Sequence, residues 1–207
     1  KLCILHITNS HVHRLPKLPK TLKVLIVRLE ALMNCKIGKL PKGLKTLKLE
    51  NCSSQRIIFP NNIKILSLIN CDNTLIIGMS NCVKKLTIYP FGNIEKLSDN
   101  LKVLKVDGAA FTNVNILPNR LKELYVINPR ELYGKLPNSL RIFKLYAGNS
   151  RSFTKKTSKK IECDNSDLVM SHNIKIISIG YGIILKDAKN FFDNLPNSLK
   201  KLEYLGE

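Results

Sequence analysis

The stretch Leu117-Pro118-Asn119-Arg120-Leu121-Lys122-Glu123-Leu124-Tyr125-Val126 contains the unit from which the chain is built. Its apolar positions Leu121, Leu124 and Val126 form a Leu-x-x-Leu-x-Leu core in which Ile, Val, Phe or Tyr can replace Leu. This core occurs ten times, with a period of about 20 residues until a longer interval follows the eighth copy. The ten copies begin at Leu2, Leu22, Leu44, Ile63, Val83, Leu101, Leu121, Leu140, Ile174 and Leu199. A pattern that stays in phase over this length predicts a repeat protein.

Each unit has the signals of a turn followed by a short strand. Leu-Pro or Phe-Pro stands before six of the cores, as in Leu40-Pro41-Lys42-Gly43 and Leu195-Pro196-Asn197-Ser198. Proline favours extended backbone before it, while Asn, Ser and Gly favour turns. The fourth and sixth core positions alternate as in a strand with one buried face. A period of about 20 residues leaves no room for a full helix.

We therefore predict one solenoid over residues 1–207. About ten parallel strands would form a concave sheet, and extended or 3₁₀ connections would form the convex side, with little α-helix. Residues 148–172 break the period and include a basic run at 151–160. They predict an inserted loop or a degenerate repeat, whose candidate roles are a nuclear-localisation or nucleic-acid patch, a phosphorylatable hinge, or none.

Composition excludes several classes of protein. The 207 residues carry a formal charge of +19, and 44% are hydrophobic, which argues against a collagen-like or disordered chain. No apolar run approaches the roughly 20 residues of a membrane span, and Lys1-Leu2-Cys3 has neither an initiator Met nor a signal-peptide pattern. We expect a soluble piece of a longer protein with no membrane partner. The abundance of Leu, Lys, Ile and Asn is also typical of AT-rich coding, so part of the charge need not reflect a ligand.

Neither catalysis nor a metal or other cofactor is predicted. The six cysteines, at positions 3, 35, 52, 71, 82 and 163, form no Cys-x-x-Cys pair, and we expect buried, reduced thiols and a cytoplasmic or nuclear location. His11 and His13 are only two potential ligands and favour surface histidines over a metal site. The sequence also lacks a P-loop, a Gly-x-Gly-x-x-Gly and a His-Glu-x-x-His motif.

The cores resemble those of leucine-rich repeat proteins. The ninth core position, where that family places Asn or Cys, is Cys52 in one copy and Cys71 in the next. Residues 195–202, Leu-Pro-Asn-Ser-Leu-Lys-Lys-Leu, are similar to the FNIP repeats of amoebae and amoeba-infecting giant viruses. Within residues 101–114, Val106, Gly108, Phe111 and Asn113 approach the FNIP signature.

This resemblance implies recognition of a protein partner by a rigid curved surface, without catalysis. A preceding F-box would make the solenoid a substrate receptor of a ubiquitin ligase. The resemblance also implies an intracellular setting, which extends to a virus-infected host cell or a virion.

The third, fifth and seventh core positions should point out of the sheet, since the fourth and sixth point inward. In copies four to eight they would form an apolar face with interleaved Tyr and Lys, which favours a protein-binding surface. The alternative is that neighbouring strands cover these aliphatic side chains. The candidate partner-binding residues are Ile65, Ile69, Tyr89, Val103, Lys105, Tyr125, Ile127, Ile142, Lys144 and Tyr146.

The second core position is basic in nine of the ten copies, which predicts a linear basic rim. Such a rim could follow a polyanion and release counterions from it. This would suit an acidic protein partner or, as the alternative function, a nucleic-acid-binding or virion-associated structural protein. The alternative is that this basic residue only increases solubility and was duplicated with each repeat, and we favour this interpretation. The rim residues are Lys23, Lys45, Lys64, Lys84, Lys102, Lys122, Arg141, Lys175 and Lys200.

Overall fold

The computed structural model describes residues 1–8, 12–35, 37–53, 58–71, 81–89, 97–107, 113–148 and 161–205. The chain divides into two compact units, Lys1–Leu101 and Lys102–Glu207. The prediction of a single solenoid over 1–207 stays a prediction. The basic run at 151–160 lies outside the described residues, as do His11, Gly108 and Phe111.

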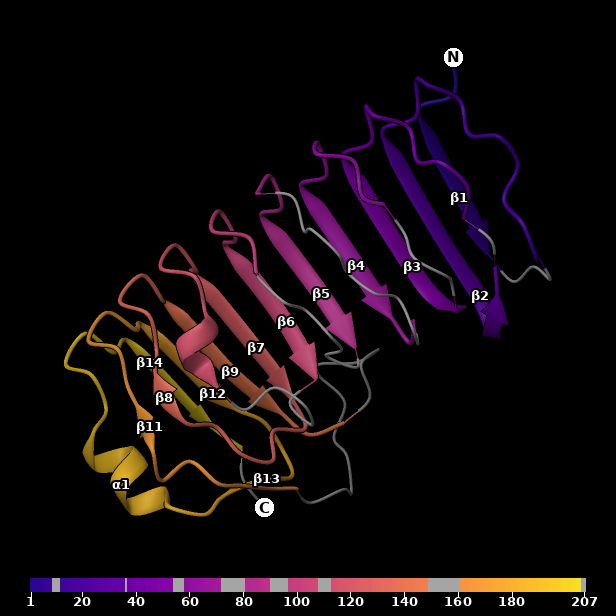
Figure 1. The fold of residues 1–207 in the computed structure, drawn as a ribbon. Helices are drawn as coiled ribbons and strands as arrows, with labels where there is room; N and C mark the ends of the chain where they lie inside the picture. Colours follow the sequence, from indigo (N-terminus) through magenta and orange to yellow (C-terminus); the bar gives the residue numbers. More distant parts are fainter. Residues whose placement is uncertain are drawn as a thin grey trace. The chain divides into compact units, whose positions relative to one another are not determined.

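The first unit contains five parallel strands, drawn in indigo to magenta in Figure 1. They are β1 (Ile4–Thr8), β2 (Val24–Asn34), β3 (Thr46–Ser53), β4 (Ile65–Ile69) and β5 (Lys85–Tyr89). Equivalent core positions are paired across the sheet, so that Leu25 lies beside Leu47, Leu47 beside Leu66, and Leu66 beside Leu86. The repeat period therefore sets the strand register.

The second unit contains five more strands of the same kind. They are β6 (Val103–Asp107), β7 (Glu123–Ile127), β9 (Ile142–Tyr146), β12 (Ile176–Ile179) and β14 (Lys201–Tyr204), again parallel and in register. The prediction of ten parallel strands is thereby confirmed in their number and direction. No helix in the described ranges is long and apolar enough to cross a membrane.

The connecting segments of the second unit form additional structure (Figure 1). Strand β8 (Gly134–Lys135) pairs with β11 (Leu168–Val169), and β10 (Ile161–Cys163) pairs with β13 (Ile183–Leu185). A 3₁₀ turn, η1 (Val114–Ile116), and one short helix, α1 (Ala188–Asp193), complete the described elements. The predicted 3₁₀ connection and the small helix content are confirmed. Part of the predicted insertion thus forms β10 and β11.

The core contains the first, fourth and sixth positions of the repeat. In strands β2 to β9 these side chains are at most 4% exposed, for example Leu47 at 0% and Val106 at 0%. Phe143 replaces Leu at a fourth position and is also fully buried. Burying one such side chain contributes about 1.5–3 kcal/mol. The column of apolar residues is therefore the main source of stability.

The turn before each core is closed by a repeated backbone hydrogen bond. The amide of the first core residue donates to the carbonyl three residues earlier, as from Leu22 to Pro19 and from Leu140 to Pro137. The residue just before the core adds a side-chain bond to the preceding repeat. The hydroxyl of Ser139 donates to the Leu121 carbonyl, and the amide of Asn62 donates to the Lys42 carbonyl. The Pro-Asn-Ser punctuation thus ties each repeat to its predecessor.

Candidate functional site

The outward face of the second unit holds an ordered row of Lys and Tyr side chains. Lys105 of β6, Tyr125 of β7 and Lys144 of β9 are neighbours in register. The ammonium of Lys105 lies 4.7 Å from the centre of the Tyr125 ring, a cation–π arrangement. The Tyr125 hydroxyl donates to Glu123 at 2.9 Å. Burial, this hydrogen bond and the Glu123 charge raise the pKa of Tyr125 well above its usual range.

A second tyrosine on this face packs against a glycine. An added Cβ on Gly180 would lie 2.9 Å from Cδ1 of Tyr146, which real Cβ contacts do not allow. Only glycine at this position leaves room for the ring in its present place. Burial raises the pKa of Tyr146, while a hydrogen bond with Ser178 acts in the opposite direction. The Tyr146 ring therefore packs closely against the backbone of Gly180.

The charges at the end of this face are paired. Lys201 and Glu203 of β14 form an ion pair at 2.7 Å. Hydrogen bonds from Lys201 and Ser178 lower the pKa of Glu203. Lys105 and Lys144 lie on the same face as Asp107, Glu123 and Glu203. The face thus has mixed charge and is not uniformly basic.

The structure places most of the predicted partner-binding residues of this unit as expected, but less exposed. Val103, Lys105, Tyr125, Ile142, Lys144 and Tyr146 are all half-buried. Ile127 is only 1% exposed, so the prediction that it projects into solvent is wrong. Asp107 and Tyr146 flank it in the same register on the two neighbouring strands. The apolar surface exposed on this face is therefore smaller than the alternation of the sequence predicts.

In the first unit the same prediction succeeds only in part. Ile65 and Ile69 of β4 are half-buried, as is expected for an outward face between strands. Tyr89 at the end of β5 is 2% exposed, so its predicted exposure is wrong. Ile69 lies directly beside it in the parallel register, and alternation along one strand does not report such cover. Tyr89 is therefore unsuited as a contact residue in the present conformation.

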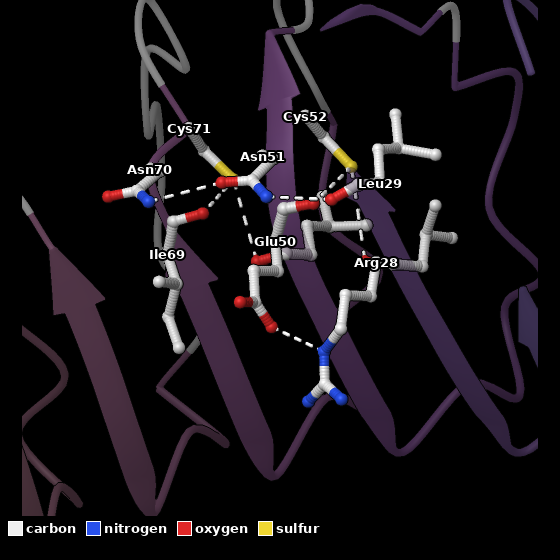
Figure 2. Close-up of polar contacts among 10 residues, drawn as sticks. Arg28, Leu29, Glu50, Asn51, Cys52, Ile69, Asn70 and Cys71 are labelled. Carbon is white, nitrogen blue, oxygen red and sulfur yellow. Dashed lines mark hydrogen bonds and ion pairs between the residues drawn. The ribbon is translucent and has the colours of Figure 1, made fainter. Parts of the chain in front are cut away.

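The carboxyl ends of β2, β3 and β4 carry a polar network that Figure 2 shows. The amide of Asn51 donates to the Leu29 carbonyl at 2.7 Å, and the amide of Asn70 donates to Oδ1 of Asn51 at 3.1 Å. Arg28 forms an ion pair with Glu50, which is largely buried. These bonds satisfy polar groups at the point where the strands end. The network links three consecutive repeats.

Two cysteines take part in the same network. The thiol of Cys52 lies 3.4 Å from the Glu50 carbonyl, and the thiol of Cys71 lies 3.4 Å from the Ile69 carbonyl (Figure 2). Burial raises the pKa of Cys52 to about 12. Such a protonated thiol is a weak hydrogen-bond donor and a poor nucleophile. The ninth position thus has the structural role that the leucine-rich-repeat resemblance implies.

Sequence reasoning missed the asparagines at the eighth position. Asn51, Asn70 and Asn128 all adopt left-handed backbone, with φ of 57°, 50° and 50°. Asparagine tolerates this region better than most residues, and its recurrence one place before Cys52 and Cys71 was the available signal. Asn128 makes two hydrogen bonds with Gly148, one in each direction, at 2.9 Å. Asn70 and Asn128 stand directly after β4 and β7, where the chain leaves the sheet, while Asn51 lies within β3.

The basic rim is ordered within each unit. The carbonyls of seven rim residues each accept two amides of the next repeat, as Lys23 does from Lys45 and Thr46 at 2.8 and 3.0 Å. The eight lysine side chains are exposed. Arg141 is half-buried because its guanidinium donates to the Asn138 and Leu140 carbonyls, both at 2.9 Å. Binding of a polyanion by this rim stays a prediction.

The cysteines only partly match the expected burial. Cys35, Cys52 and Cys163 are buried, while Cys3 and Cys82 are exposed, so the prediction is wrong for these two. Both stand next to the first residue of a core, where the strand has not yet begun. Among the described residues, no group of three or more His, Cys, Asp and Glu side chains could hold a metal ion.

Comparisons with known proteins support the fold but give no function. No family model matches the chain, and no curated protein matches it. One similar solved structure is the crystal structure of CroV588, described as a novel circular LRR protein, with a TM-score of 0.52 and 18% sequence identity. The match covers 98% of this chain and 37% of CroV588. The similarity and the stacked parallel strands together show a leucine-rich-repeat-like solenoid fold.

Proposed function

We propose that this chain is a non-catalytic protein-interaction module. In this proposal a partner binds to the outward, predicted concave, face of the sheet, with Lys105, Tyr125, Lys144 and Tyr146 as the main contact residues. The observation that carries the proposal is the fixed Tyr and Lys row on β6, β7 and β9, held by the cation–π contact and by packing on Gly180. Leucine-rich-repeat-like solenoids generally mediate protein–protein interaction, which agrees with this assignment.

Preorganised aromatic side chains favour binding energetically. Tyr125 and Tyr146 have fixed rings with part of their surface exposed, so ordering them on binding costs little entropy. Tyrosine is also one of the residues enriched among those that dominate interface energy. The nearby Lys144 and Glu203 add charges of both signs. A partner with charges of both signs and with apolar side chains would suit this face.

The proposal extends to the setting of the protein. The similarity of residues 195–202 to FNIP repeats supports an FNIP type of repeat. The free cysteines support an intracellular location, including a virus-infected amoeba or a virion. If an F-box precedes these residues in a longer protein, the same face would bind substrates for ubiquitination.

The test compares a face variant with a control variant on the basic rim. The double variant Tyr125→Ala/Tyr146→Ala removes both rings, and Lys122→Ala/Lys175→Ala alters two exposed rim residues instead. Proteins captured from a host-cell lysate by the wild-type chain are quantified by mass spectrometry, and the best partner is then measured by calorimetry. We expect the face variant to lose about tenfold or more in affinity. An unchanged set of partners and unchanged affinity in the face variant would rule out the proposal.

Nucleic-acid binding is a second candidate, which the stacked and exposed rim lysines favour. It predicts binding of RNA or DNA at low salt, with an affinity that falls steeply as salt rises. Changing Lys64, Lys84 and Lys102 together to Glu should then remove most of the binding. Absence of binding at low salt excludes this candidate and leaves the protein-interaction proposal intact.

A further inference from the structure

The first unit contains a groove whose residues have no role in the proposed function. It has a volume of about 1000 Å³ and lies between two consecutive connecting segments, residues 14–20 and 38–43. Both segments contain the same tetrapeptide, Lys17-Leu18-Pro19-Lys20 and Lys39-Leu40-Pro41-Lys42. The four other Leu-Pro or Phe-Pro pairs that stand directly before a core lack it. The repeated tetrapeptide therefore marks this groove.

The two segments are held side by side by the repeat geometry. Each is closed by the same 3.0 Å hydrogen bond, from Leu22 to Pro19 in one and from Leu44 to Pro41 in the other. The ammonium of Lys23 lies over Gly43, within 2.8 Å of where a Cβ would stand. A cation of one repeat thus lies against the turn of the next, and both segments line the same groove.

The groove combines an apolar base with a cationic edge. Leu15 and Leu40 are 4% and 5% exposed, and Leu18 is half-buried between the two segments. The lining cations are all exposed: Arg14, Lys17, Lys20, Lys39 and Lys42. No acidic residue of the described part lines the groove.

These cations have no partner within the described residues. No hydrogen bond or ion pair joins the side chains of the five cations to another described group. Residues 1–50 contain eleven Lys and Arg but only two acids, Glu30 and Glu50. Glu50 pairs with Arg28 on the strand and not with the groove. Five like charges within one groove repel one another unless an anion neutralises them.

We propose that this groove binds an acidic peptide segment of a partner protein, in extended conformation, with its carboxylates on the lysines and its aliphatic side chains on Leu18 and Leu40. Charge complementarity requires an anionic occupant, and the apolar base requires apolar side chains between the charges. No aromatic residue of the described ranges lines the groove, whereas single-stranded nucleic acid is usually held by stacking on aromatic rings. An acidic peptide therefore fits better than an oligonucleotide.

The test uses a fluorescein-labelled peptide of ten residues in which Glu alternates with Leu. Binding to the full chain is measured by fluorescence anisotropy at low salt. The variant Lys20→Glu/Lys42→Glu should weaken binding by about tenfold or more, because each substitution replaces attraction with repulsion. The control Lys122→Glu/Lys175→Glu makes the same change in net charge on the second unit and should cost less than about threefold. The face variant Tyr125→Ala/Tyr146→Ala should not change the affinity, which separates this inference from the proposed function.

A second pair of peptides tests whether the leucines of the groove bind apolar side chains of the peptide. A peptide in which Ala replaces Leu should bind several-fold more weakly to the wild-type chain, and Leu18→Ala should reduce this difference. Far-UV circular dichroism and urea unfolding check that each variant is folded.

Four results would overturn the inference. One is absence of peptide binding at low salt, and another is an equal loss in the groove and control variants. The third is that Ala and Leu peptides bind equally well. The fourth is tighter binding of a single-stranded oligonucleotide of equal charge, or of phosphatidylserine vesicles, that is lost in the same groove variant, since the occupant would then be nucleic acid or a membrane surface.

Discussion

The connecting segments of the two units line grooves of opposite chemical character. In the first unit, Lys20 and Lys42 follow the Leu-Pro pairs, and the charged residues among the described lining are all basic. In the second unit, a groove of about 710 Å³ uses the equivalent Leu195-Pro196 turn, but Asn197 follows the proline. Its described lining includes Asp167 and Asp193 and contains no Lys or Arg. The same turn thus forms a cationic groove in one unit and an acidic, amide-rich one in the other.

This difference teaches that the fold and the surface depend on different positions of the repeat. Both grooves stand next to turns closed by the same bond, from Leu44 to Pro41 and from Leu199 to Pro196. The residues that set the charge contribute only exposed side chains, as Lys42 and Asn197 do. Changes at these positions can alter ligand preference at little cost in stability.

We expect the largest effect on stability from replacing the buried leucine beneath each groove. Leu40 lines the first groove and Leu168 lines the second, with exposures of 5% and 8%. We expect Leu40→Ala and Leu168→Ala each to lower the free energy of unfolding by about 2–5 kcal/mol, because each leaves a cavity. Urea denaturation measures this change. Leu205→Ala is the control and should have a small effect, because this side chain is 42% exposed. If Leu40→Ala had an effect as small as that of Leu205→Ala, the buried leucine would not support the first groove.

A smaller effect is expected for the clamp that supports the acidic groove. Asn165 is 2% exposed, its amide donates to the Asp187 carbonyl at 3.0 Å, and its Oδ1 accepts from the Asp187 amide at 3.1 Å. Asp187 caps the start of α1, which carries the groove residues Asn190 and Asp193. Asn165→Ala leaves buried polar groups unpaired and should cost about 1–3 kcal/mol in urea unfolding. The exposed Asn197→Ala is the matched control, and equal effects of the two would refute the clamp.

The turn bonds should contribute about 1 kcal/mol each. The hydroxyl of Ser198 donates to the His172 and Ile174 carbonyls at 2.6 and 2.7 Å, and Thr21 occupies the same place in the first unit, bonded to the Leu2 carbonyl. We expect Ser198→Ala to lower the free energy of unfolding by about 1 kcal/mol, while Ser198→Thr retains the hydroxyl and most of the stability. A loss of the same size in Ser198→Thr would mean that the hydroxyl bonds are not responsible.

The smallest effect concerns pH and is specific to the second unit. The hydrogen bond from Lys186 at 2.7 Å, together with bonds from Ser166, lowers the pKa of Asp164 to about 2. A carboxyl with a depressed folded-state pKa contributes stability above its unfolded value near 4, and this stability is lost as the pH falls toward 2. The melting temperature of Lys186→Gln should therefore be slightly lower than that of the wild type at pH 5.

The two melting temperatures should converge as the pH falls from about 4 to about 2. A difference that stayed constant down to pH 2 would exclude Asp164 as its source. Lys189→Gln is the control, because Lys189 is exposed and forms no ion pair with another described residue.

Much of the fold could be predicted because the repeat pattern follows mainly from the spacing of the inward-facing apolar residues. The first core residue is followed two positions later by the start of a strand, as Ile63 precedes β4 at Ile65 and Leu121 precedes β7 at Glu123. The inward positions then alternate with a period of two residues, which is a local property of the chain. Strand positions and register therefore follow from the spacing of leucines.

Features that depend on pairs of distant residues could not be predicted in this way. Tyr89 and Ile127 are buried although they occupy outward positions of their strands, and alternation along one strand does not report such burial. The pairing of Gly134–Lys135 with Leu168–Val169 involves only two residues on each side, too few for a periodic signal. The cationic groove was visible only as turn residues until consecutive turns were placed side by side.

The hydrogen bonding of the basic rim has a consequence for protein engineering. At Lys23, Lys45 and Lys64 of the first unit, and at Lys102, Lys122 and Lys175 of the second, the main-chain carbonyl joins adjacent strands while the side chain extends into solvent. The rim is therefore a row of addressable sites, one per repeat, at the strand spacing of about 4.8 Å. Metal-binding, fluorescent or crosslinking groups could be installed there in chosen combinations, so that the chain would act as a molecular ruler whose divisions are set by its own backbone.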